Sequence, residues 1–82
     1  MITADQVRAA RAAGYAAGRA LEPARSNPYA RYVPSWSRPR DPGQARRLER
    51  EQRDAARLAR VWLAGWRAGL DEHAAQRAAG GR

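Results

Sequence analysis

The chain has no cysteine, no lysine and no phenylalanine, and it has one histidine among 82 residues. Without cysteine it has no disulfide framework, no thiol nucleophile and no zinc–thiolate site, which fits a reducing compartment. A single histidine, His73, leaves no paired-histidine metal site, and no catalytic triad can be assembled. The sequence also lacks a phosphate-binding GxxxxGK[ST] loop. We therefore expect no enzyme, no cofactor and no metal ion.

Long apolar runs are also lacking. No segment approaches the ~18 to 20 apolar residues of a membrane span, and the first residues have neither the basic nor the apolar region of a signal peptide. A chain this short buries only roughly 60% of the surface that its unfolded form exposes, so a deep pocket is not expected. These absences predict a cytoplasmic protein with no membrane partner and no small-molecule substrate.

Basic charge is abundant. The 16 basic residues, all arginine, exceed the 8 acidic residues and give a net charge of +8. Such an excess favours an anionic partner, and arginine both holds phosphate bidentately and stacks on bases. Nucleic acid is therefore the favoured partner. The alternative explanation is a GC-rich genome, which replaces lysine by arginine whatever the function.

A first helix is predicted over about residues 3–21. Thr3 and Gln6 have the spacing of a capping box, in which each side chain satisfies a backbone donor of the other residue. Pro23 disfavours helical geometry in the residue before it and so ends the helix. A linker follows over residues 22–41, rich in proline and aromatic residues.

A second, longer helix is predicted over about residues 42–79. Asp41 supplies an N-cap, and Pro42 occupies the first helical position, where its missing N–H costs nothing. Gly80 ends the helix, and residues 80–82 form a frayed tail.

The same short pattern occurs once in each predicted helix. Ala13-Gly14-Tyr15-Ala16-Ala17-Gly18 is repeated as Ala64-Gly65-Trp66-Arg67-Ala68-Gly69. Each glycine inside a helix costs about 1 kcal/mol relative to alanine, so close helix packing is expected to offset the cost. We expect a single all-α domain over residues 1–82, an antiparallel two-helix hairpin. Its predicted packing residues are Gly14, Gly18, Trp62, Gly65 and Gly69. The alternative is that the glycines mark local flexibility.

Arginines stand beside aromatic residues in the first helix and in the linker. Bases stack on aromatic rings, and nearby arginines hold the phosphates, so this pattern is typical of an RNA-binding surface. The predicted RNA-binding residues are Arg8, Arg11, Tyr15, Arg19, Arg25, Tyr29, Arg31, Tyr32, Trp36, Arg38 and Arg40. Alternatively, the linker aromatics cover exposed core.

Arginines also recur along the second helix at alternating steps of four and three residues. The set is Arg46, Arg50, Arg53, Arg57, Arg60 and Arg67. This spacing places them on one continuous stripe. Acidic residues at salt-bridging distance in the same helix favour the alternative of a merely solvated face.

Three ordered motifs resemble those of the ribosome modulation factor family of small basic bacterial proteins. They are Gly14-Tyr15-Ala16-Ala17-Gly18, Pro28-Tyr29, and Trp62-Leu63-Ala64-Gly65-Trp66-Arg67. The resemblance covers about residues 7–29 and 58–70, roughly half of the chain. The sequence departs from the family pattern in a long insertion over residues 30–57, in Asn27 where cysteine is common, and in Leu21 where glycine is usual.

The resemblance implies a two-helix protein that binds 16S ribosomal RNA on the small ribosomal subunit, silences translation and promotes pairing of ribosomes in dormancy. It adds Trp66 and Arg67 to Tyr29 on the predicted RNA surface. Two alternatives stay open. One is a homodimeric helical interaction protein whose arginines only solubilise it, and the other is a small phage- or plasmid-type nucleic-acid-binding protein.

Overall fold

Two helices and one short turn make up the described part of the chain. The computed structural model describes residues 2–30 and 41–80. Helix α1 spans Ala4–Arg19, the 3-10 turn η1 spans Ala24–Ser26, and helix α2 spans Pro42–Gly80. Neither described range contains a strand. The all-α class, the two packed helices and the greater length of the second are confirmed.

Both helices begin with the caps that the sequence predicts. At α1, the Gln6 N–H donates to the Thr3 hydroxyl (3.1 Å), and the Thr3 N–H donates to the Gln6 side-chain oxygen (2.9 Å). At α2, the Gln44 N–H donates to the Asp41 carboxylate (2.7 Å). Each bond satisfies a backbone donor that the helix leaves unpaired, so the helix starts are set locally.

Helix α1 ends in a Schellman motif with an unusual residue at its turn. The Glu22 N–H donates to the Ala17 carbonyl (2.9 Å), and the Leu21 N–H donates to the Gly18 carbonyl (3.1 Å). The motif requires the left-handed conformation at Leu21, which has φ 60°. Glycine is the usual residue there because a β-carbon is strained in that region. Leu21 is also 54% exposed, so burial of its side chain offsets little of the strain energy of its backbone.

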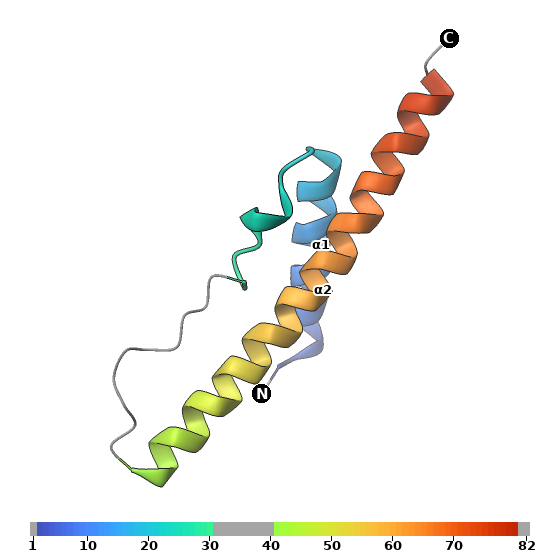
Figure 1. Cartoon of the computed structure of the whole chain (residues 1–82). Coiled ribbons are helices and arrows are strands. Elements are labelled where there is room, and N and C mark those ends of the chain that lie inside the picture. The colour runs from blue at the N-terminus through green and yellow to red at the C-terminus, as the bar shows by residue number, and fades with distance from the viewer. Residues whose placement is uncertain (1, 31–40, 81–82) are drawn as a thin grey trace.

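The two helices run in the same direction, and the antiparallel arrangement expected from the sequence is wrong. Gly14 lies against Trp62 and Gly18 lies against Trp66, so the contacting positions rise together along both helices. Figure 1 shows the same sense for α1 and α2, with the chain after α1 turning back beside α2. An extended chain spans ~3.3 Å per residue, so a connection of about 20 residues can return along the whole of α1.

The helix contact has a local two-fold symmetry that follows from the repeat. In the repeat, Gly14 corresponds to Gly65 and Arg11 corresponds to Trp62. A β-carbon added to Gly14 would overlap the carbonyl oxygen of Trp62, and one added to Gly65 would overlap the carbonyl oxygen of Arg11. Gly18 with Trp66 and Gly69 with Tyr15 form the second equivalent pair. The second pair lies four residues further along both helices than the first, which agrees with the parallel arrangement.

The core is small and centred on one tryptophan. Trp62 is 2% exposed, and Ala10 and Ala17 of α1 are buried beside the glycines. Trp62, which the sequence predicts as the hydrophobic anchor, is the most buried large side chain of the described residues. Helix α2 extends past α1 at both ends (Figure 1), so α1 covers only the middle of the longer helix.

Replacing Gly65 by alanine is expected to destabilise the protein, although alanine is the better helix former. The added methyl group would meet the Arg11 carbonyl oxygen and the Tyr15 nitrogen, the latter at 3.0 Å, and backbone atoms cannot move aside without separating the helices. Overpacking of this kind costs about 1–3 kcal/mol. Thermal unfolding followed by circular dichroism measures the loss.

Gly14→Ala should behave in the same way, whereas Gly80→Ala is the control, because a β-carbon at Gly80 meets nothing within 4 Å. Equal melting temperatures for Gly65→Ala and Gly80→Ala would contradict the close contact.

Replacing Leu21 by glycine is expected to stabilise the protein. The substitution removes left-handed strain of about 1–2 kcal/mol, partly offset by the greater entropy of unfolded glycine, about 0.5–1 kcal/mol. Urea unfolding should show a higher midpoint. Ala20→Gly is the matched control, because Ala20 has φ −82° and glycine relieves nothing there. A gain in both variants, or in neither, would contradict strain at Leu21.

Candidate nucleic-acid interface

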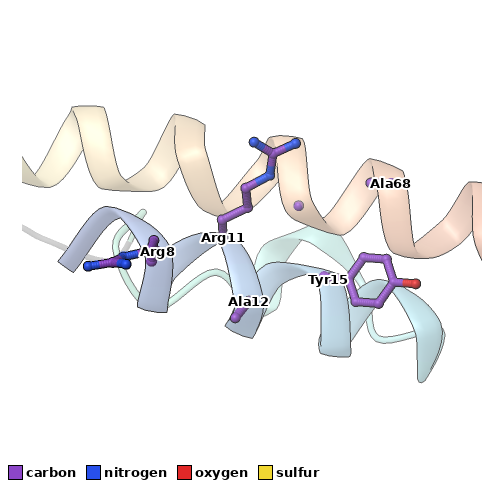
Figure 2. Close-up of a pocket in the computed structure, with 6 residues that line it drawn as sticks. Arg8, Arg11, Ala12, Tyr15 and Ala68 are labelled. Carbon is purple, nitrogen blue, oxygen red and sulfur yellow. The ribbon is translucent and has the colours of Figure 1, made fainter. Parts of the chain in front are cut away.

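A groove of about 430 Å³ lies between α1 and α2, beside the glycine contact. Its floor is apolar and shallow because Ala12 and Ala68 carry only methyl groups and Gly65 carries no side chain. Its size falls within the roughly 300–1,000 Å³ of small-ligand sites. The lining residues are Arg8, Arg11, Ala12, Tyr15, Gly65 and Ala68 (Figure 2).

The helical repeat of α1 brings the polar lining residues together. Arg8, Arg11 and Tyr15 follow one another at steps of three and four residues, which share a face of a helix. In Figure 2 the Arg11 side chain extends from α1 toward α2, and the Tyr15 ring and Arg8 lie toward opposite ends of the site. Backbone atoms of Tyr15 contact both Gly65 and Gly69, so the helix contact fixes the position of the half-buried ring.

Positive charge surrounds this groove. Helix α1 carries three arginines and a single acidic residue, Asp5, which pairs with Arg8 on the exposed surface. Arg19 lies with its guanidinium 6.0 Å from the centre of the Tyr15 ring and donates to the Gln76 side chain (3.1 Å). Arg11 has no ion-pair or hydrogen-bond partner within residues 2–30 and 41–80. The groove therefore combines an apolar floor, an aromatic ring and a guanidinium available for an anion.

No family model, no curated protein and no solved structure matches the chain. The resemblance to the ribosome modulation factor family thus rests on the three motifs alone.

The other predicted RNA-binding residues lie apart from this groove. Arg25 is exposed on η1, Tyr29 is half-buried on the returning segment, and Arg67 is exposed on α2. Trp66 is half-buried, and its indole N–H donates to the Glu22 carbonyl (2.7 Å), so Trp66 ties the end of α1 to α2. The linker residues Arg31, Tyr32, Trp36, Arg38 and Arg40 lie outside the described residues.

Asn27 is a structural residue that the sequence analysis missed. It is 4% exposed, its amide nitrogen donates to the Ala59 carbonyl (3.0 Å), and its amide oxygen accepts from the Tyr29 N–H (3.1 Å). These bonds fasten the returning segment to α2. An Asn-Pro pair is typical of turn initiation, and this signal at residues 27–28 could have identified the turn but not its partner on α2.

Two absences hold for the described residues. Within residues 2–30 and 41–80, no group of three histidine, cysteine or acidic side chains could hold a metal ion. No helix in the same ranges is both long enough and apolar enough to cross a bilayer.

Replacing Asn27 by alanine is expected to loosen the returning segment. The substitution removes both bonds of a buried amide, which costs about 1–3 kcal/mol, and Asn27→Asp should also lose stability because a carboxylate accepts but does not donate to Ala59. Trypsin should cleave after the exposed Arg25 several-fold faster in both variants than in the original chain. Ser26→Ala is the control. Unchanged cleavage after Arg25 in Asn27→Ala would contradict the fastening role.

Proposed function

We propose that the chain binds RNA through the groove between α1 and α2. An unpaired base lies on the apolar floor against Tyr15, and Arg8 and Arg11 hold the adjacent phosphates. The observation that carries the proposal is this combination of a positioned aromatic ring, a shallow apolar floor and arginines at the rim. Single-stranded RNA is recognised by stacking on aromatic rings with cations along the backbone.

The proposed target is the ribosomal RNA of the small subunit, and the proposed effect is silencing of translation. The motif resemblance supports this target, and the structure gives the motif residues a shared purpose. Gly14, Gly18 and Gly65 form the helix contact, and Trp62 and Trp66 anchor it. Of the motif residues, Tyr15 and Gly65 also line the groove, whereas Tyr29, Trp66 and Arg67 lie apart from it. A protein with the same glycine and tryptophan motifs would therefore share the helix contact and this part of the groove.

The homodimer alternative has less support. It needs an exposed glycine face on each helix, whereas Gly14, Gly18, Gly65 and Gly69 are buried against the other helix of the same chain. A homodimer would have to use another surface, and large exposed hydrophobic side chains in the described ranges are limited to Leu21.

Added to a cell-free translation system, the chain should inhibit initiation at amounts close to those of the small subunit and should sediment with it. Arg11→Glu should lose most of the inhibition, whereas Arg77→Glu, an equal charge reversal on the exposed end of α2, should keep it. Tyr15→Ala should weaken binding to a single-stranded RNA by about 1–3 kcal/mol, and Tyr15→Phe should retain binding.

The outcomes separate the two parts of the proposal. Single-strand binding that depends on Tyr15, without an effect on translation or sedimentation with small subunits, would retain the groove and overturn the ribosomal target. Equal losses of RNA affinity in Arg11→Glu and Arg77→Glu would overturn the groove. A preference for duplex DNA over RNA would favour the phage-type alternative.

A further inference from the structure

We propose that α2 carries a second nucleic-acid site, an arginine ridge that binds the phosphates of an RNA duplex. The ridge consists of Arg46, Arg50, Arg53, Arg57, Arg60 and Arg67. It shares no residue with the groove, and the proposal stands on the geometry and charge of α2 alone.

The ridge lies on the side of α2 that faces away from α1. All six arginines are exposed, as is Ala64, which fills the one gap in the alternation of four- and three-residue steps. Trp62, Gly65 and Gly69 contact α1, and they lie about half a turn around the helix from the ridge. The packing that holds the fold together therefore leaves the ridge open along its whole length.

The ridge is long and straight. Its ends, Arg46 and Arg67, are 21 residues apart, which at ~1.5 Å per residue is roughly 31 Å. One turn of a DNA duplex is roughly 34–36 Å, and a turn of the A-form RNA duplex is somewhat shorter, so the ridge is about as long as one turn of either. The first part of α2 projects beyond the start of α1 (Figure 1), so this arm of the ridge extends clear of the shorter helix.

The ridge keeps its positive charge. Between residues 42 and 60 the chain has six arginines and three carboxylates, Glu49, Glu51 and Asp54. All six ridge arginines are exposed, and arginines outnumber carboxylates in this part of α2. A merely solvated face is the alternative, and the duplex-binding test below distinguishes it from a phosphate site.

A duplex is the occupant that this geometry fits. A continuous helix presents its guanidinium groups in a fixed row, and a duplex presents its phosphates in fixed rows, whereas a single strand must first be held extended. Arginine binds phosphate through two parallel N–H donors, and duplex RNA is recognised mainly through its shape and backbone. A membrane fits less well, because surface-bound helices also present large apolar side chains. The ridge positions are occupied by arginine and alanine.

The test compares two double variants that remove equal charge. Arg53→Gln with Arg57→Gln removes two adjacent ridge arginines, and Arg25→Gln with Arg77→Gln removes two exposed arginines elsewhere. Binding of the full chain to a blunt 16-base-pair RNA duplex is followed by fluorescence anisotropy from 50 to 300 mM salt, and circular dichroism checks that each variant is helical. The ridge variant should bind the duplex roughly 10- to 30-fold more weakly near 0.15 M salt. The slope of log affinity against log salt should become about 1.8 less steep, since each lost phosphate contact contributes about 0.9.

The control variant should lose less than about threefold and keep its slope. Equal losses in both double variants would mean that only net charge matters and would overturn the ridge, as would duplex binding that is unchanged in the ridge variant. Tyr15→Ala distinguishes this test from that of the groove. This variant should bind the duplex as tightly as the original chain. If Tyr15→Ala weakens duplex binding as much as the loss of Arg53 and Arg57 does, the duplex binds in the groove and the ridge proposal is overturned.

Discussion

The close contact between two helix backbones at Gly14 and Gly65 is the constraint on which the rest of the structure depends. Within residues 2–30 and 41–80, Trp62 is the one large hydrophobic residue that is buried, and the other buried residues of the two helices are alanine and glycine. Such a core gains its stability from the many atoms that the missing β-carbons bring within van der Waals reach. For the same reason, one added methyl group at either glycine forces the helices apart.

The same missing side chains shape the groove. Gly65 contacts the backbone of α1 and also forms part of the groove floor. The absence of its side chain therefore allows the close helix contact and leaves space for the groove. Tyr15 has two roles as well, because its backbone lies in the contact while its ring lines the groove. Fold and site are therefore coupled at these two positions, and the side chains of Arg8 and Arg11 are the parts of the site that can change without disturbing the scaffold.

The sequence predicts the local features well because each depends on neighbouring residues. The capping box at Thr3, the N-cap at Asp41 and the anchoring role of Trp62 follow from spacing of a few residues. The direction of packing does not follow in the same way. A pair of glycines four residues apart marks a small-residue face but does not indicate whether the partner helix runs parallel or antiparallel to it. An antiparallel hairpin is the default for consecutive helices joined by a short loop. The length of the connection was the available signal for a parallel pair.

Asn27 shows the same limit at the level of one residue. The Asn-Pro pair marks a turn, but its bond to Ala59 joins residues that come together only once the returning segment lies beside α2. Its near-complete burial in a segment otherwise mostly exposed shows that the turn is part of the fold and more than a tether. Long-range pairings of this kind depend on the whole path of the chain, which local spacing does not encode.

The groove and the ridge are adjacent in the sequence of α2 but lie on different sides of this helix. Ala68 lines the groove, and the preceding residue, Arg67, ends the ridge about 100° further around α2. The groove has room for an unpaired base, while the ridge matches about one turn of duplex. If both proposals hold, an RNA in which an unpaired nucleotide adjoins a stem would use both surfaces, whereas a uniform single strand or a blunt duplex would use one. The projecting arm of α2 would then give selectivity for structured RNA in addition to charge, because only a stem that continues in the direction of the helix can reach Arg46 while its unpaired neighbour remains at Tyr15.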